Sequence, residues 1–326
     1  MIWFYFILTA FFLVFFSYKL CGEGKKISEN THISESMIGI IFLAVATSFP
    51  EVITAVSSIH FFDKTALAFG DIIGSVIFNF MIIGAVDYMY GKGRVYLKVS
   101  YSNERSALLI FVILIIYLLS VCLRKFFGLF DVAGIGIEGL IILFIYFFYM
   151  KNFSEEDTKE KTLKKLPEIS SKDKFLMWFR FSCLLGSVIL VGIILAWVSS
   201  KIVETTTISE TFFGCVFLGI STSLPEVIVS LSAMRIGAYH MAIGNILGSN
   251  IFDLAILPVL DFFNKKPILG GVTKGQILSI IVASVISVIF ITAFKLKHNT
   301  VRRINGETLL ILLVGLIGFV LTYLIE

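Results

Sequence analysis

Charged residues are scarce in this sequence. Asp, Glu, Lys and Arg make up 15% of the 326 residues, while hydrophobic residues make up 57%; a soluble domain carries about 25% charged residues. The shortage excludes an ordinary soluble globular protein and predicts an integral membrane protein, because surface that faces lipid must be apolar. A net charge of +4 is also too small to indicate nucleic-acid binding.

The sequence has few ligands for soft or borderline metals. Its four cysteines, Cys21, Cys122, Cys183 and Cys215, show no metal-ligand spacing, and we interpret them as small apolar residues. The four histidines lie in connections or at the ends of apolar runs. A zinc or copper site is therefore not expected.

Long apolar runs divide the chain into ten candidate membrane spans. Runs of this length must be helices, because an isolated strand in lipid would leave its backbone polar groups unpaired. The first run has neither a basic leading segment nor a small-residue cleavage site, so we expect a retained span rather than a signal peptide. The expected fold is an all-α membrane protein with spans at approximately 1–18, 37–59, 65–87, 107–123, 132–150, 175–200, 211–233, 237–260, 277–294 and 306–325.

Lys and Arg are distributed unevenly among the connections. Most lie in connections that are cytoplasmic if the N-terminus is outside, above all in the lysine-rich segment 151–174. Cytoplasmic connections carry the excess of Lys and Arg in membrane proteins. We therefore expect a multi-pass protein of the cell membrane with both termini outside.

Two segments of the chain occur twice. "GIIFLAVATSFPEVITAVSS" (39–58) aligns with "GCVFLGISTSLPEVIVSLSA" (214–233), and "GDIIGSVIFN" (70–79) aligns with "GNILGSNIFD" (244–253). Each half then has five spans, and because five is odd, the second half enters the membrane inverted. Inverted halves with interrupted helices are typical of transporters with a binding site near the bilayer midplane. The expected division is a first repeat at 1–150, a short cytoplasmic linker at 151–174 and a second repeat at 175–326.

The first repeated motif places a proline and a glutamate inside a span, at 47–51 and again at 222–226. Pro50 has no N–H and cannot bond to the carbonyl of Ala46; Pro225 leaves the same gap in the second copy. A simple kink would explain one such proline. Two in matching positions, each beside hydroxyls and a glutamate, favour a cation that satisfies the freed carbonyls. The flanking candidates are Thr47, Ser48, Glu51, Thr222, Ser223 and Glu226.

The second repeated motif, Gly-Asp-Ile-Ile-Gly-Ser and Gly-Asn-Ile-Leu-Gly-Ser, lies near the start of the third and eighth spans. Its glycines allow neighbouring helices to approach closely, and this packing role is one explanation of the motif. Packing does not explain Asn79, which lies on the same helical face as Ser75, four residues earlier. Asp253 lies in the same way on the face of Ser249.

The deep carboxylates have no basic residue at comparable depth. Glu51, Glu226 and Asp253 lie well inside spans, and Asp71 lies nearer a span end. Charged groups inside a span are costly and usually face a partner or a cavity. We infer a bound metal cation. Carboxylate, amide, hydroxyl and carbonyl oxygens suit Ca²⁺, and Na⁺ as a hard cation accepts the same set.

The motifs resemble those of the cation/Ca²⁺ exchanger superfamily and, within it, the prokaryotic Na⁺/Ca²⁺ exchangers. That family carries a G-T-S-x-P-E motif and a G-N-x-x-G-S-N-x-x-[ND] motif in each of two inverted repeats; here they read "ATSFPE" and "STSLPE", then "GDIIGSVIFN" and "GNILGSNIFD". The resemblance implies that Glu51 and Glu226 bind Ca²⁺ and Na⁺ in alternation. The implied ligands are the side chains of Thr47, Ser48, Glu51, Ser75, Asn79, Thr222, Ser223, Glu226, Ser249 and Asp253 and the backbone carbonyls of Ala44 and Gly219.

The motifs also depart from the family pattern. Ala46 and Ser221 replace motif glycines, Asp71 replaces the usual Asn, and Val76 replaces the Asn after Gly-Ser. None of these changes removes an implied ligand, but Asp71 adds a carboxylate beside the site. We expect a minimal exchanger without a large regulatory domain.

The expected function is a secondary antiporter that exchanges Na⁺ for Ca²⁺ by alternating access, because Asp253 paired with Asn79 resembles the Na⁺-coupled branch of the family. A Ca²⁺/H⁺ antiporter or a K⁺-dependent Na⁺/Ca²⁺ antiporter is the alternative, and a cation channel is a more distant one. An intramembrane protease is disfavoured, because Ala68 stands where the Gly-x-Gly-Asp pattern needs glycine. The expected partners are Ca²⁺ and Na⁺ as substrates and the lipid bilayer; no cofactor, enzymatic activity or obligate protein partner is expected.

Overall fold

The structure is a computed structural model, and it describes residues 1–29, 44–91, 101–127, 131–132, 134–159, 170–235, 239–264, 267–296 and 306–326. Most of these residues are helical. The elements in chain order are α1 (Ile2–Glu29), α3 (Ala44–Thr47), α4 (Phe49–His60), α5 (Thr65–Val86), the π-helical turn η2 (Asp87–Gly91), α6 (Tyr101–Phe127), β1 (Asp131–Val132), β2 (Ile135–Gly136), α7 (Ile137–Lys159), α8 (Ser171–Thr205), α9 (Glu210–Phe213), the π-helical turn η4 (Gly214–Leu218), α10 (Gly219–Thr222), α11 (Leu224–Arg235), α12 (Tyr239–Leu260), the 3₁₀ turn η5 (Ile268–Gly271), α13 (Lys274–Leu296) and α14 (Gly306–Ile325).

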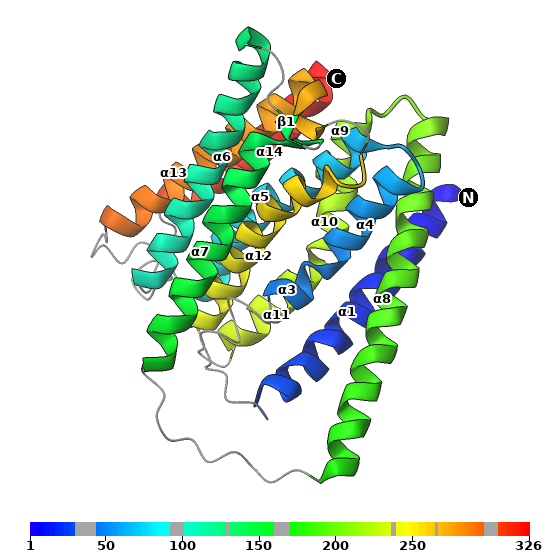
Figure 1. The fold of residues 1–326 in the computed structure, drawn as a ribbon, viewed down its shortest axis with the longest axis vertical. Helices are drawn as coiled ribbons and strands as arrows, with labels where there is room; N and C mark the ends of the chain where they lie inside the picture. Colours follow the sequence, from blue (N-terminus) through cyan, green and yellow to red (C-terminus); the bar gives the residue numbers. More distant parts are fainter. Residues whose placement is uncertain are drawn as a thin grey trace.

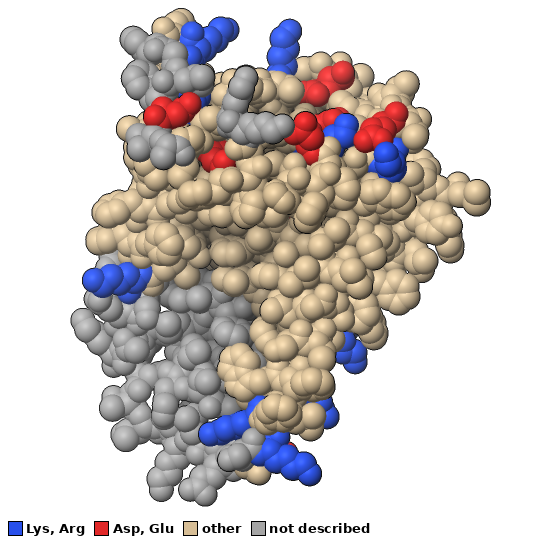
Figure 2. Space-filling view, turned by 45° about the vertical axis from the view of Figure 1, so that its right-hand side comes forward, with Lys and Arg blue, Asp and Glu red and all other residues tan. Residues whose placement is uncertain are grey.

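The described helices are those of a membrane protein. Seven are long and apolar enough to cross a bilayer, and a bent pair, Glu210–Thr222 with Leu224–Arg235, makes eight if it counts as one span. Charged side chains lie mainly toward the two ends of the molecule, with a broad uncharged belt between them (Figure 2). The predicted span 37–59 begins in residues 37–43, which lie outside the described residues.

The prediction of a span at 132–150 is wrong at its start. Residues Asp131–Val132 and Ile135–Gly136 pair as a short antiparallel hairpin, and the helix begins at Ile137. Gly134 lies between the two strands with φ 85°, a left-handed conformation that glycine adopts without a steric penalty. Arg124 at the end of α6 connects the hairpin to this helix through an ion pair of 2.9 Å with Asp131.

The expected linker 151–174 is partly helical. α7 continues to Lys159 and α8 begins at Ser171, while 160–169 lie outside the described residues. The Ser170 hydroxyl caps α8 by accepting a hydrogen bond from the backbone N–H of Lys172; such caps satisfy donors that have no partner within the helix. Both flanking helices therefore extend beyond the apolar runs that predicted them.

α5 and α12 form the centre of the molecule. They pack against each other, and α4, α13 and α14 also pack on α5 while α6, α7 and α11 pack on α12 (Figure 1). In the apolar stretches of α5 and α12, 83% and 89% of the residues are buried. The corresponding shares are 22% for α1 and 28% for α8, two helices that pack against each other at one side of the molecule. The two helices that carry the Gly-Ser motifs are thus the most shielded from lipid.

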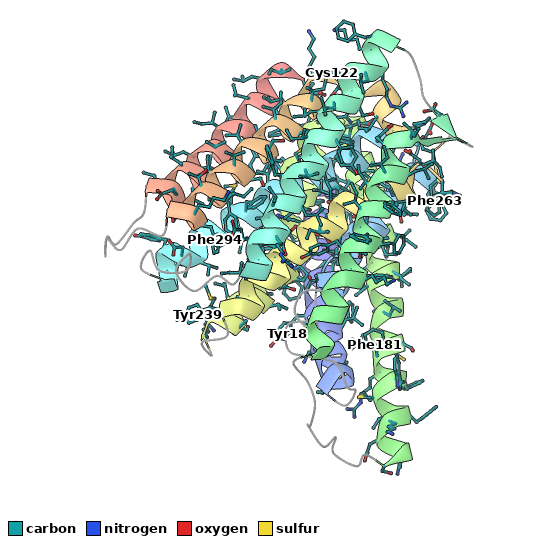
Figure 3. The ribbon with its side chains drawn as sticks, turned by 60° about the vertical axis from the view of Figure 1, so that its left-hand side comes forward. Tyr18, Cys122, Phe181, Tyr239, Phe263 and Phe294 are labelled. Carbon is teal, nitrogen blue, oxygen red and sulfur yellow. The ribbon has the colours of Figure 1, made fainter. Side chains whose placement is uncertain are left out.

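The peripheral helices present large apolar side chains outward (Figure 3). On α8, for example, Phe175, Phe179 and Leu190 are 72%, 55% and 61% exposed. In water such a continuous apolar surface would be unfavourable, but in a bilayer it contacts lipid chains. The exposed apolar residues therefore agree with the composition rather than indicating a protein-binding surface.

Glycines allow α5 to lie directly against the segment around η4. A Cβ atom on Gly70 would come within 2.6 Å of the Thr211 carbonyl oxygen and 3.0 Å of the Cys215 backbone nitrogen. A Cβ on Gly74 or Gly214 would overlap backbone atoms of the opposing segment in the same way. The helix-packing role predicted for the second motif is therefore present on α5.

Both proline motifs interrupt their helices at equivalent serines. Ser48 separates α3 from α4 with φ −82° and ψ 6°, and Ser223 separates α10 from α11 with φ −85° and ψ 1°. The second break bends the helix by 42°. The cause is the proline two residues later in each motif, Pro50 or Pro225, which removes one hydrogen bond and crowds the preceding turn.

Candidate functional site

The three deep carboxylates lie at the helix breaks and on α12. Glu51 and Glu226 are in the first turns of α4 and α11, where the positive end of a helix dipole favours a negative charge. Asp253 lies on α12, and all three side chains are fully buried. None of the three forms an ion pair with Lys or Arg within the described ranges. All twelve residues predicted for the site are buried.

Each broken helix holds the glutamate of the other. The Ser48 hydroxyl donates to Oε1 of Glu226 at 3.1 Å, and the Ser223 hydroxyl donates to Oε1 of Glu51 at 3.1 Å. These four residues are equivalent in pairs in the sequence repeat. The reciprocal bonds bring the two first motifs together across the centre of the molecule.

The threonines of the first motif contact the serines of the second motif in the opposite half. Thr47 Oγ1 lies 3.2 Å from Ser249 Oγ, and Thr222 Oγ1 lies 3.4 Å from Ser75 Oγ. The Ser249 hydroxyl also donates to Oε1 of Glu226 at 3.2 Å. The hydroxyls predicted from the sequence therefore form one cluster around the carboxylates.

The two backbone carbonyls implied by the resemblance are both hydrogen-bonded. The Ala44 carbonyl accepts from the backbone N–H of Ser48 at 2.9 Å and from the Thr47 hydroxyl at 3.1 Å. The Gly219 carbonyl accepts from the backbone N–H of Ser223 at 3.2 Å and from the Ser75 hydroxyl at 3.2 Å. A carbonyl oxygen has two lone pairs, so a cation would compete with a hydroxyl donor at both carbonyls, with Thr47 at Ala44 and with Ser75 at Gly219.

Several buried oxygen atoms of the site have no hydrogen-bond partner within the described ranges. Leaving a buried carboxylate oxygen without a partner is costly, and native structures pair nearly all such groups. Asn79 and Asp253 also make no hydrogen bond to the other predicted ligands in the part of the chain that the structure describes. The unpartnered oxygens are Glu51 Oε2, Glu226 Oε2, Asp253 Oδ1, Asp253 Oδ2 and Asn79 Oδ1.

The donor set suits a hard cation. Within the described ranges, no three His, Cys, Asp or Glu side chains are arranged to hold a metal ion by themselves, so a cation here would also need hydroxyl, amide or carbonyl oxygens. Oxygen ligands of mixed type are those that Ca²⁺ prefers, and the unpaired carboxylates supply the opposite charge. The arrangement can bind a cation reversibly, but it holds no activated nucleophile or acid–base pair for covalent chemistry.

Asp71 is a fourth buried carboxylate beside this cluster. Its Oδ1 accepts from the Thr222 hydroxyl at 3.0 Å, and its Oδ2 accepts from the Thr54 hydroxyl. Asp71 therefore touches one predicted ligand, Thr222, without having an unpartnered oxygen of its own. The sequence signal for it was its departure from the Asn that the motif usually carries, which is present in the second copy as Asn245.

Asn250 belongs to the site although the sequence did not single it out. Its carboxamide oxygen accepts from the amide nitrogen of Asn79 at 2.9 Å, across the contact between α5 and α12. Asn250 is fully buried, and among the described residues the bond leaves the Asn79 oxygen and the Asn250 amide nitrogen without partners. The signal that could have found it is the Asn after Gly-Ser in the second motif, where the first motif has Val76.

Tyr117 is a second residue that the sequence did not single out. Pro258 lies inside α12, and because it has no N–H, the carbonyl of Leu254 loses its partner within the helix. The Tyr117 hydroxyl on α6 donates to that carbonyl at 2.5 Å. Tyr117 thereby links α6 to α12 at Leu254, the residue after Asp253.

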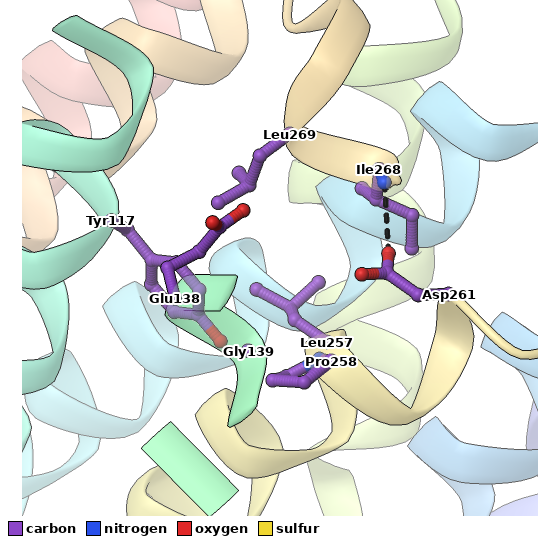
Figure 4. Close-up of a pocket in the computed structure, with 8 residues that line it drawn as sticks. All are labelled: Tyr117, Glu138, Gly139, Leu257, Pro258, Asp261, Ile268 and Leu269. Carbon is purple, nitrogen blue, oxygen red and sulfur yellow. Dashed lines mark hydrogen bonds between the residues drawn. The ribbon is translucent and has the colours of Figure 1, made fainter. Parts of the chain in front are cut away.

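Tyr117 also lines a small pocket at the end of α12 (Figure 4). The Asp261 carboxylate lies there and accepts from the backbone N–H groups of Ile268 and Gly136, at 2.8 and 3.2 Å. Burial raises the pKa of the Asp261 carboxyl above its ordinary value, and these two donors oppose that effect. Asp261 therefore connects the end of α12 to the segments at Gly136 and Ile268, and it is separate from the unpartnered oxygens of the predicted site.

Tyr117→Phe is expected to destabilise the protein by about 1–3 kcal/mol, because the Leu254 carbonyl is left buried without a donor. Thermal unfolding of the purified protein in detergent measures the effect. Tyr323→Phe is the matched control, since Tyr323 is 58% exposed. Equal unfolding temperatures for the two variants would contradict the role given to Tyr117.

Known proteins resemble this chain over most of its length. The family model described as sodium/calcium exchanger protein matches residues 1–153 and 176–322. An uncharacterised membrane protein of Methanocaldococcus jannaschii, MJ0091, is 26% identical and is covered to 82%, with 81% of this chain aligned. The putative antiporter CaxA of Alkalimonas amylolytica is 23% identical over 96% of both chains.

A solved structure shares the fold. The sodium-calcium exchanger NCX_Mj, soaked with Na⁺ and Sr²⁺, superposes with a TM-score of 0.60 at 21% identity, covering 97% of this chain and 96% of that one. The matched ranges of the family model include every residue predicted for the site. The chain therefore belongs to the sodium/calcium exchanger protein family, whose members are membrane transporters and not enzymes.

Proposed function

We propose that this protein is an antiporter that exchanges Na⁺ for Ca²⁺ across the membrane by alternating access. Both ions would compete for one carboxylate-lined site near the midplane, so that the Na⁺ gradient drives Ca²⁺ movement. The ligands proposed for this site are Thr47, Ser48, Glu51, Ser75, Asn79, Thr222, Ser223, Glu226, Ser249 and Asp253, with the carbonyls of Ala44 and Gly219.

One observation carries the proposal: buried oxygens from both halves of the chain lack partners, and no basic side chain neutralises them within the described ranges. The unpartnered atoms belong to Glu51 and Asn79 in one half and to Glu226 and Asp253 in the other. Several buried carboxylates without counter-charge are stable together only if protons or cations bind to them. A site whose charge must be balanced by bound cations or protons is suited to exchange, because the departure of one ion is favoured when another takes its place.

The reciprocal bonds also support an inverted repeat of five spans in each half, ten in all, with the division 1–150, 151–174 and 175–326. Ser48 with Glu226, and Ser223 with Glu51, are the contacts that a twofold relation of the halves would generate. In such a fold the interrupted helices face each other and the halves move relative to one another. Both termini lie toward the same end of the molecule (Figure 1), which is consistent with the proposed location of both outside the cell.

Na⁺ is proposed as the coupling ion because the free oxygens include an amide and a carboxylate in equivalent positions, Asn79 and Asp253. Neutral amide and hydroxyl oxygens can bind Na⁺ but do not take up protons. The relative NCX_Mj is named a sodium-calcium exchanger, which supports the same choice.

Reconstitution into proteoliposomes tests this function. An outward-directed Na⁺ gradient is expected to drive Ca²⁺ uptake without K⁺ and without a pH gradient. Uptake that needs only a pH gradient would make the protein a Ca²⁺/H⁺ antiporter, and uptake that requires K⁺ would make it a K⁺-dependent exchanger. Ca²⁺ flux that is indifferent to every counter-ion would indicate a channel and would refute antiport.

A further inference from the structure

The two halves of the proposed site are unequal at one position. Asn79 is held by Asn250, whose amide oxygen accepts from the Asn79 amide nitrogen at 2.9 Å. Among the described residues, this bond leaves the Asn79 oxygen and the Asn250 amide nitrogen without partners. The amide of Asn79 is therefore oriented before any cation binds.

The sequence repeat identifies the equivalent pair in the other half. Residues 70–79 align with 244–253, so Asp253 corresponds to Asn79 and Val76 corresponds to Asn250. Val76 is fully buried and has no polar group. Accordingly, both carboxylate oxygens of Asp253 lack a hydrogen-bond partner among the described residues, whereas Asn79 has one.

We propose that Val76 is a specificity-determining residue, because it leaves both oxygens of Asp253 available to the transported cation. This inference rests on the proposed function. A donor at position 76 would stabilise the ion-free carboxylate, and a cation would have to compete with it; valine removes that competition. Charge-assisted hydrogen bonds are stronger than neutral ones, so a donor at position 76 would compete effectively with a cation for Asp253. The affinity for Ca²⁺ is expected to be affected most, because Ca²⁺ takes many oxygen ligands.

The asymmetry also has a physical reason in the charge of the two residues. An amide in a buried site needs a fixed orientation, because only its oxygen binds a cation, and Asn250 supplies that orientation. A carboxylate has two equivalent oxygens and needs no such control. Asn at position 250 and Val at position 76 are thus matched to Asn79 and Asp253, respectively.

Val76→Asn tests the proposal in the full-length protein purified in detergent. Ca²⁺ affinity is measured from the shift of the unfolding temperature with Ca²⁺ concentration. The Kd for Ca²⁺ is expected to rise about tenfold, as expected for one added hydrogen bond to a charged group. Val76→Leu, whose side chain has the same number and branching of heavy atoms as Asn but no donor, is expected to change the Kd far less.

Two further variants keep the test decisive. Val76→Thr preserves the shape of valine and adds one hydroxyl donor, so a smaller rise in Kd is expected even if Val76→Asn folds poorly. In the Asp253→Asn background, Val76→Asn is expected to add little, because the carboxylate that it would bind is absent. This lack of additivity separates an effect on Asp253 from general destabilisation.

The outcomes distinguish this inference from the proposed function. Wild-type Ca²⁺ affinity in both Val76→Asn and Val76→Thr would overturn the role of Val76. A wild-type protein that binds Ca²⁺ in detergent but shows no Na⁺-driven uptake in proteoliposomes would overturn the proposed function alone. Absence of Ca²⁺ binding by the wild-type protein would overturn both.

Discussion

Glu226→Gln is expected to reduce Na⁺-driven Ca²⁺ uptake by about 100-fold or more, because the site loses a buried charge that no neighbouring group can replace. Gln has the shape of Glu and keeps an oxygen that can accept from Ser48 and Ser249, so the helices around the break should still pack. What changes is the charge on the carboxylate, whose Oε2 atom has no partner among the described residues. In Gln either that atom or its neighbour becomes an NH₂ group, which repels a cation.

The same loss is expected for Glu51→Gln, because Glu51 has the equivalent bond from Ser223 and the equivalent free oxygen. Glu204→Gln is the matched control. Glu204 lies in an exposed pair with Lys201, whose side chains are 39% and 44% exposed, and exposed pairs contribute little. Initial rates of Ca²⁺ uptake at equal reconstituted protein provide the comparison; wild-type rates in Glu226→Gln would remove Glu226 from the site.

Gly74→Ala is expected to have the largest effect on stability, because α5 packs there directly on the backbone at Cys215. A Cβ atom would overlap the carbonyl oxygen and the Cα of Cys215. Backbone atoms cannot rotate away as a side chain can, so the helices must separate. We expect a loss of about 3 kcal/mol in the free energy of unfolding, at the upper end of the usual cost of overpacking.

Transport should fall with stability in Gly74→Ala, because the neighbouring Ser75 hydroxyl bonds to the Gly219 carbonyl across the same contact. Gly186→Ala on α8 is the control, since a Cβ there has no atom within 4 Å. Alanine is also the better helix former, by up to about 1 kcal/mol, so this variant should be as stable as the wild type or more so. If Gly74→Ala unfolds at the temperature of Gly186→Ala, the close approach does not contribute to stability.

Much of the candidate site could be predicted because the same polar residue types occur at equivalent positions in both copies of the repeat. A proline and a glutamate in a span are each unfavourable alone, and their recurrence at 222–226 indicates a cation site from the residues themselves. The breaks at Ser48 and Ser223 follow from local rules, since proline disrupts the turn before it wherever the helix packs. Long apolar runs likewise predict helices with little ambiguity, because lipid leaves few alternatives.

Local patterns failed where non-local contacts decided the outcome. The start of the span predicted at 132–150 is a hairpin held by Arg124, and neither the pairing nor the ion pair can be derived from hydropathy. Glu138 is buried and forms an ion pair of 2.6 Å with Arg124, a contact that hydropathy does not predict either. Each of these depends on which segments meet after folding.

From the sequence alone, it could be determined that this is a helical membrane protein with two repeated motifs that predict a cation site, because these features depend on composition and on the covalent chemistry of the backbone. Only the tertiary structure decided which oxygens accept hydrogen bonds from the protein and which have no partner among the described residues. Asn79 is held by Asn250 while Asp253 has no partner among the described residues, and Tyr117 satisfies the carbonyl that Pro258 frees. The physical reason is that a hydrogen bond needs two groups in contact, and these pairs are far apart in the chain and meet only where α5, α6 and α12 pack together.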